Sequence, residues 1–266
     1  MAYIPPAVID SDAHVIENNL TWDHLEPAEA KYRPNIVTDP KDPTVKRWEV
    51  NGQIGPRVLA TVEAPDGIGT TAGKSDRNVG TPQESRELSN IKARLDHMDA
   101  LGIDIQVLHT TMWLYPMTQD PDAEAAMTFA WNKWLAAIWD QSDGRLPWSC
   151  LVPLSQPDEA VRQMRWARER GAVAVFMRPL DEDRSLIDES FYPIYQEAEN
   201  LDMSMAVHIA NGSDAHVELY HNAAAGSRAL PFALFRTPTV TGTMLLLMSD
   251  IKKTFPKLRW GIIEAS

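Results

Sequence analysis

Cysteine is nearly absent from this sequence, and basic residues are few. Because Cys150 is the only cysteine, an internal disulfide and a Cys-rich zinc site are both excluded. Lysine and arginine together number 25 against 37 acidic residues, which gives a formal net charge of -12, and no basic run stands out. We therefore expect no nucleic-acid partner and no attraction to an anionic membrane surface.

Long apolar runs and nucleotide-binding motifs are also missing. The longest purely apolar run near the end of the chain, residues 244–248, is far too short to span a bilayer. The first residues lack the charged start and apolar core of a signal peptide, so we expect a soluble cytoplasmic protein. No G-x-G-x-x-G or P-loop motif follows an expected strand, which argues against a nucleotide-binding fold.

The 266 residues, 44% of them hydrophobic, are enough to bury a sizeable core. Short apolar runs alternate with amphipathic segments along the chain. We expect strands within residues 8–17, 103–108, 146–154, 172–177, 203–207 and 260–263, and helices at about 83–100, 122–141, 157–170, 191–200, 228–235 and 239–254. This alternation predicts a parallel α/β sheet with helices outside it, either an open doubly wound sheet or a (β/α)8 barrel.

Residues 18–82 form an expected insertion between the first two strands. Asn51-Gly52, set among alternating residues from 46 to 62, predicts a β-hairpin. Residues 63–82 are rich in Gly, Pro, Thr and Asp, which is typical of a mobile loop, and we consider a lid there. The helix at 122–141 has a tryptophan-rich face, which fits a buried core or the interface of a homo-oligomer.

Polar side chains stand where the expected strands end. Asp12 and His14 are two residues apart on the first strand, so they point to the same side and form a plausible half of a metal site. Four later strands run into His109, Arg178, His208 and Glu264. Barrel enzymes build their sites at the carboxyl ends of their strands, and this pattern therefore favours the barrel.

These residues also match a known family. The matching pieces, in chain order, are Ile9-Asp10-Ser11-Asp12-Ala13-His14 with Glu17, residues 98–104, Val207-His208 and residues 255–259. With this combination the chain resembles the amidohydrolase-related branch of the amidohydrolase superfamily, which includes the aminocarboxymuconate-semialdehyde decarboxylase-like proteins. The resemblance implies a metal-dependent (β/α)8 barrel that acts on a small organic molecule.

The family's motif can be placed on this chain residue by residue. Asp12 and His14 occupy the two positions of the family's first-strand H-x-H, and His208 matches its fifth-strand histidine ligand. Glu264 stands where many members carry a histidine, as in one sub-branch. The family's aspartate at the end of strand eight has no counterpart, since the sequence stops two residues after Glu264. We therefore expect one barrel domain over residues 1–266 with six of its eight strands, C-terminally truncated.

The resemblance implies a set of metal ligands for one or two divalent ions: Asp12, His14, Glu17, His109, His208 and Glu264. Oxygen and nitrogen ligands of this kind suit zinc, manganese or iron. The primary hypothesis is a metal-dependent hydrolase in which bound water becomes the nucleophile. The alternatives are a nonoxidative decarboxylase, a nonheme diiron oxygenase and a non-catalytic degenerate barrel.

Roles for individual residues follow from the hydrolase hypothesis. Glu264, or the family's strand-eight aspartate, would accept the proton of the water, and His208 would hold the ion at the reacting centre. Arg178 would take part in catalysis by gripping a substrate carboxylate with both arms of its guanidinium. His216 and His221, in an expected loop at 211–226 over the mouth of the barrel, would contact the substrate.

Overall fold

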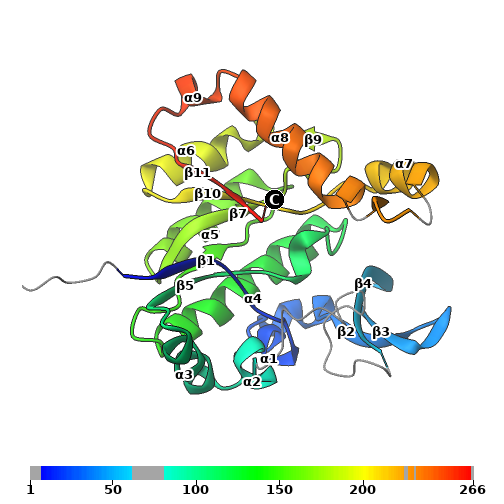
Figure 1. The fold of residues 1–266 in the computed structure, drawn as a ribbon, viewed down its shortest axis with the longest axis vertical. Coiled ribbons are helices and arrows are strands. Elements are labelled where there is room, and N and C mark those ends of the chain that lie inside the picture. The colour runs from blue at the N-terminus through cyan, green and yellow to red at the C-terminus, as the bar shows by residue number, and fades with distance from the viewer. Residues whose placement is uncertain (1–6, 62–80, 225–226, 231, 265–266) are drawn as a thin grey trace, which may run out of the picture.

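A curled parallel sheet forms the centre of the fold. The computed structural model describes residues 7–61, 81–224, 227–230 and 232–264. Six strands pair in parallel in the following order: β1 (Ile9–His14), β5 (Ile105–His109), β6 (Trp148–Cys150), β7 (Ala172–Met177), β10 (Ser204–His208) and β11 (Trp260–Ile263). The sheet curves into part of a barrel with β1 and β11 at its two ends (Figure 1). The predicted partial (β/α)8 barrel is confirmed.

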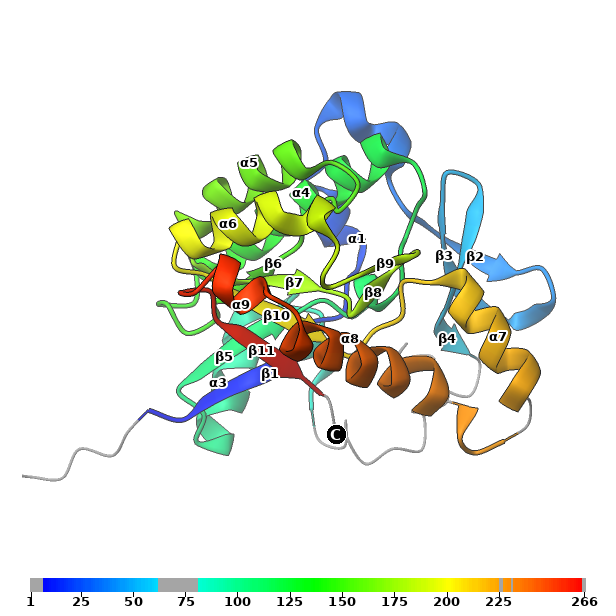
Figure 2. The same ribbon diagram turned by 90° about the horizontal axis from the view of Figure 1, so that it is seen from above.

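Helices lie along the outer side of this sheet (Figure 2). They are α3 (Ile91–Leu101), α4 (Pro121–Trp139), α5 (Pro157–Arg168), α6 (Tyr192–Asn200), α8 (Thr237–Met248) and α9 (Ile251–Thr254). Helix α5 shows why they form: Pro157 opens it, Asp158 and Glu159 follow in its first turn, and Arg165 and Arg168 stand in its last. These charges complement the helix dipole. Among the described residues, no helix combines the length and apolarity needed to cross a bilayer.

The tryptophan-rich face of α4 belongs to the core of the chain. Trp131 and Trp134 are buried and, together with Leu135, join the main hydrophobic cluster. Of the two interpretations that the sequence left open for this face, the structure supports a buried core.

The two faces of β10 have different surroundings. Met205 and Val207 are fully buried in the hydrophobic core. Ser204 and Ala206 line the concave side of the sheet, where a cavity of about 420 Å³ lies. His208 follows on this second face, and the small residues before it leave the concave side open beneath it.

The insertion after β1 forms a small sheet of its own. It contains α1 (Asn19–Trp22), the 3-10 helix η1 (Pro27–Tyr32), and the antiparallel strands β2 (Asn35–Asp39), β3 (Asp42–Val50) and β4 (Gln53–Thr61). Asn51 and Gly52 join β3 to β4 with φ of 51° and 76°, a turn that matches the twist of a hairpin. The predicted hairpin is confirmed. The expected mobile loop lies almost wholly outside the described residues.

The prediction of a single helix at 83–100 is wrong. The chain instead forms α2 (Gln83–Arg86) and α3, separated by residues 87–90. Leu88 breaks the helix with a left-handed backbone, φ 52°, while its side chain stays buried. The side chain of Asn90 then caps α3 by accepting the backbone N–H of Ala93 at 3.1 Å. Leu88 in the linker packs in the same cluster as Ile91, Leu95 and Met98 of α3, which is why the apolar spacing resembles that of one long helix.

The prediction of a loop at 211–226 is also wrong, because residues 214–224 form the helix α7 (Asp214–Ala224). Asn211 Oδ1 accepts the backbone N–H of Ser213 at 3.0 Å, and Ser213 Oγ accepts that of His216 at 3.3 Å. The polar residues that suggest a loop are therefore the turn and the cap that start a helix.

Other boundaries need smaller corrections. The helix expected at 228–235 is a π-helical turn, η5 (Phe232–Arg236), that leads directly into α8, and the one expected at 239–254 divides into α8 and α9. The strand expected at 146–154 pairs with its neighbours only over the residues of β6. It ends there because the side-chain amide of Asn132 hydrogen-bonds to the backbone N–H and C=O of Leu151. The remaining short elements are η3 (Met112–Leu114), β8 (Leu180–Asp181), β9 (Arg184–Ser185) and η4 (Glu189–Phe191).

Candidate metal centre

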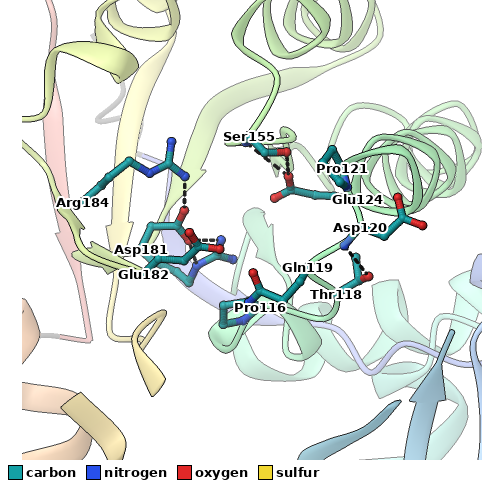
Figure 3. A pocket seen from close by; sticks show the side chains of 11 residues that line it. Pro116, Thr118, Gln119, Asp120, Pro121, Glu124, Ser155, Asp181, Glu182 and Arg184 are labelled. Atoms are coloured by element: carbon teal, nitrogen blue, oxygen red, sulfur yellow. Dashed lines mark hydrogen bonds and ion pairs between the residues drawn. The ribbon is translucent and has the colours of Figure 1, made fainter. Parts of the chain in front are cut away.

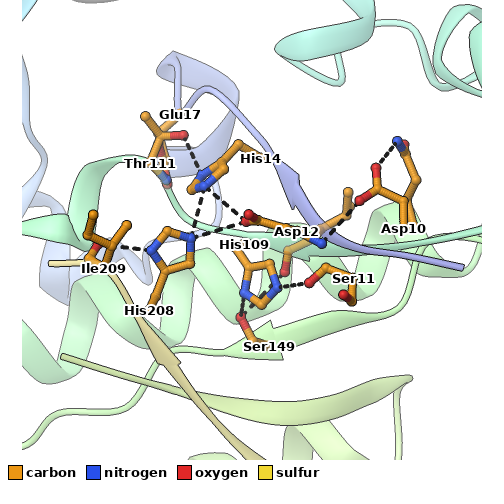
Figure 4. A network of polar contacts seen from close by, with 12 residues as sticks. Asp10, Ser11, Asp12, His14, Glu17, His109, Thr111, Ser149, His208 and Ile209 are labelled. Atoms are coloured by element: carbon orange, nitrogen blue, oxygen red, sulfur yellow. Dashed lines mark hydrogen bonds and ion pairs between the residues drawn. The ribbon is translucent and has the colours of Figure 1, made fainter. Parts of the chain in front are cut away.

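Three side chains converge at the carboxyl ends of β1, which is one edge of the sheet, and β10, which is next to the other edge. The Nε2 atoms of His14 and His208 are 3.0 Å apart, and Asp12 Oδ1 lies 3.6 Å from the first and 3.3 Å from the second (Figure 4). Neighbouring ligand atoms around an ion with bonds of about 2.1 Å are separated by about 3.0 to 3.4 Å. Two of the three separations lie in this range and the third, 3.6 Å, is slightly longer, so the triangle is close in size to one face of a metal coordination sphere.

An irregularity in β1 helps to aim Asp12 at the two histidines. Three residue steps, Asp10 to Ala13, stand opposite two steps on β5, so β1 carries one extra residue at this point. Asp10 stabilises the bulge, because its carboxylate accepts the backbone N–H of Asp12 at 3.1 Å and the side-chain amide of Gln106 at 2.9 Å. Bulges of this kind commonly redirect a side chain beside a functional site.

Hydrogen bonds on the far side of each imidazole set its orientation. His208 Nδ1–H donates to the carbonyl of Ile209 at 2.9 Å, which leaves Nε2 with a lone pair. His14 Nδ1 lies 3.1 Å from the hydroxyl oxygen of Thr111. A lone pair of His208, facing a second imidazole nitrogen and a carboxylate, is stabilised only by a proton or a cation between them. The donor set thus fits a divalent ion.

The charge of Asp12 suits the same purpose. Partial burial raises the pKa of its carboxyl group, but a hydrogen bond from protonated His208 and the positive charges that His208, His14 and His109 carry in acid outweigh burial and hold the pKa below its usual value. Asp12 is therefore ionised at neutral pH and supplies the negative charge that a cation needs.

Comparison with known proteins places this chain in a family. A family model described as amidohydrolase matches residues 9–266. The chain belongs to the amidohydrolase family. The solved structures that share its fold include decarboxylases.

Three of these structures illustrate the likeness. An amidohydrolase from Mycobacterium avium subsp. paratuberculosis is 21% identical with a TM-score of 0.75, over 99% of this chain and 73% of its own. A 5-carboxyvanillate decarboxylase from Novosphingobium aromaticivorans, solved with manganese and a nitrobenzoic acid, is 17% identical with a TM-score of 0.63, over 96% and 64%. A 2,6-dihydroxybenzoate decarboxylase from Rhizobium is 21% identical with a TM-score of 0.54, over 63% and 53%. The chain thus spans about half to three quarters of these relatives, and at such identities the likeness concerns the fold.

His109 does not join the three converging residues of this amidohydrolase. Its Nε2–H donates to the carbonyl of Ser11 at 2.9 Å, and its Nδ1 accepts from the hydroxyl of Ser149 at 2.8 Å. Burial, assisted by the charge of His208, lowers the pKa of His109 to about 4. His109 is a neutral buried histidine that packs between β1 and β6, and its predicted role as a ligand is not needed to explain its position.

Glu17 is also apart from the group. Its buried carboxylate accepts hydrogen bonds from Thr110, Thr111, Met112 and Trp131. Glu264 follows β11 as the last described residue; it is half-buried and has a left-handed backbone, φ 54°. It does not belong to the group of three that the described residues form.

Arg178 lies among partners of its own. Its Nε donates to Asp181 Oδ1 at 2.8 Å, its Nη2 donates to the same oxygen, and its Nη1 donates to the carbonyl of Trp113 at 3.3 Å. Arg184 donates to the other oxygen of Asp181 at 2.8 Å, beside a polar cavity of about 30 Å³ (Figure 3). The guanidinium that was predicted to bind a substrate carboxylate belongs to a residue that is 4% exposed, and it is already paired with the carboxylate of Asp181.

The two histidines predicted to contact the substrate lie on α7. His216 Nε2 donates to the carbonyl of Ala233 at 3.0 Å, and its ring packs beside Tyr220. The side chain of His221 lies outside the described residues. Asp214, at the start of the same helix, borders a cavity of about 270 Å³ together with Gln53 of β4.

Sequence reasoning missed the groups that orient the histidines. These are Thr111, Ser149 and the backbone carbonyls of Ser11 and Ile209. Thr111 had a signal, since it stands two residues after His109, just beyond a strand end. A carbonyl leaves no trace in the sequence, because every residue carries one.

Proposed function

We propose that this chain is a metal-dependent hydrolase that acts on a small organic substrate. The observation that carries the proposal is the convergence of Asp12, His14 and His208, with their three ligand atoms 3.0 to 3.6 Å apart. A divalent ion bound there would lower the pKa of a coordinated water toward neutrality and polarise a carbonyl group. Zinc, manganese and iron suit this mixture of oxygen and nitrogen ligands.

The chain's own residues would divide the remaining work. The carbonyl of Ile209 fixes the orientation of the His208 ring, and Asp12 is ionised, so both side chains are prepared to bind a cation. We assign the proton of the attacking water to Glu264. This assignment is supported by the register of β11, in which Ile263 stands opposite His208, so that Glu264 follows at the adjoining strand end.

A nonoxidative decarboxylase is the second candidate. It is favoured by the similar structures named as decarboxylases, one of which holds manganese. Decarboxylation also needs a positive group for the departing carboxylate, and Arg178 is the residue predicted for that purpose. Its pairing with Asp181 weakens this candidate relative to hydrolysis, because the guanidinium would first have to leave a buried partner.

The test compares the three reactions on the same metal-loaded protein. The chain is incubated with zinc, manganese or iron and assayed on panels of amides, esters and lactones, and on hydroxybenzoates. The proposal predicts hydrolysis that requires the ion and is lost in His208→Asn. Release of CO₂ from a hydroxybenzoate would favour the decarboxylase, and two irons with uptake of O₂ would favour the oxygenase. Absence of bound metal and of any activity would leave the non-catalytic barrel.

A further inference from the structure

Glu17 is a buried carboxylate that accepts hydrogen bonds from one short turn and from one helix. Its Oε1 accepts the Thr110 hydroxyl at 2.5 Å and the Thr111 N–H at 3.1 Å, and its Oε2 accepts the Met112 N–H at 3.1 Å. Trp131 of α4 adds its indole N–H to Oε1 at 3.1 Å. The side chain, 4% exposed, therefore fixes three consecutive residues immediately after β5.

The middle residue of this turn reaches the candidate metal centre. The hydroxyl oxygen of Thr111 lies 3.1 Å from Nδ1 of His14, and its backbone N–H is held by Glu17 (Figure 4). A hydroxyl group can donate or accept a hydrogen bond, so it can serve Nδ1 in either tautomer of the ring. The contact runs from Glu17 through Thr111 to the ring of His14.

His14 depends on such a contact more than His208 does. The carbonyl that orients His208 belongs to the next residue, Ile209, and is supplied by the backbone. For His14, Arg94 anchors the backbone carbonyl through two contacts of 3.4 Å, and the contact at Nδ1 of the ring comes from a side chain, the hydroxyl of Thr111. Outer groups that orient a metal-binding histidine commonly change metal affinity when they are removed.

We propose that Glu17 is a positioning residue that holds Thr111 and, through it, the imidazole of His14 in the orientation needed for a metal ion. The inference rests on the proposed metal site and assigns Glu17 a role other than the direct ligand expected from the sequence. Its four accepted hydrogen bonds explain why it is a carboxylate: each donor points at an oxygen, and an amide would present an N–H₂ group to one part of that set.

Titration of the full chain with Zn²⁺ and with Mn²⁺, followed by calorimetry, tests the inference. Glu17→Gln and Thr111→Val should each weaken binding by about 10- to 100-fold, whereas Thr111→Ser, which keeps the hydroxyl, should bind close to wild type. The double variant should bind no more weakly than the weaker single variant, because both changes break the same path. Ile194→Val, in the core of α6, serves as the control for a general loss of stability.

The outcomes separate the possible failures. Additive losses in the double variant, or a Thr111→Val protein that binds like wild type, would overturn the positioning role. If Glu17→Gln does not fold, the comparison of Thr111→Val with Thr111→Ser tests the positioning role alone, because only serine keeps the hydroxyl group. Unchanged binding in His208→Asn would remove the metal site itself and the inference with it, whereas loss in His208→Asn alone would refute only the inference.

Discussion

The buried imidazole of His109 should make the stability of this protein depend on pH in a calculable way. Burial and the charge of His208 lower its pKa from 6.5 to about 4 in the folded chain. Between these two values the unfolded chain binds a proton that the folded chain does not. The free energy of unfolding therefore falls as the pH falls from 6.5 to 4, and this contribution levels off below that. The gap between the two pKa values corresponds to at most about 3 kcal/mol.

Replacing His109 with asparagine isolates this effect. Asparagine does not titrate, and it retains a polar group near the hydroxyl of Ser149. Urea unfolding, followed by tryptophan fluorescence in the presence of a chelator, measures both proteins from pH 7.5 to 4. Titrating groups that do not contact His109 act equally in both, so wild type should lose about 3 kcal/mol more than His109→Asn over this range. Parallel stability curves would show that His109 titrates alike in both states and would refute the reasoning.

Three further predictions concern buried groups away from the metal centre. Asp181→Asn should destabilise the fold by about 3 to 5 kcal/mol in urea unfolding, because it leaves the buried guanidinium of Arg178 without its counter-charge; an unchanged midpoint would contradict this pairing. Gly171→Ala should cost about 1 to 3 kcal/mol in the same assay, since φ is 101° and a Cβ would lie 2.3 Å from the ring of Trp139. Cys150 should resist iodoacetamide at pH 8 until the chain is unfolded, because burial raises its pKa to about 12; rapid labelling of the native protein would be inconsistent with its position.

The parts of the site that the sequence could predict are those set by local geometry. Asp12 and His14 lie two residues apart at a strand end, and His208 ends a strand whose alternate residues are small, so a period of two was enough to predict their common side. The parallel order of strands then brings their carboxyl ends to one edge of the sheet. That is why residues 194 positions apart could be expected in one site.

The parts that could not be predicted depend on partners distant in the chain. Glu17 and His109 have the residue types of metal ligands, but long-range contacts with Trp131 and Ser149 engage them elsewhere. Helix α7 was missed because cap residues and loop residues share one composition. The charge of Arg178 was predicted at a strand end, but its neutralisation by Asp181 depends on how the chain turns after β7.

The metal content of the chain, purified without added metal and compared with His208→Asn, tests the central claim most directly. If Asp12, His14 and His208 hold a divalent ion, wild type should carry about one zinc, manganese or iron per chain and the variant close to none. Wild-type protein that carries no ion and takes up none when metals are added would contradict the claim, and so would equal contents in the two proteins.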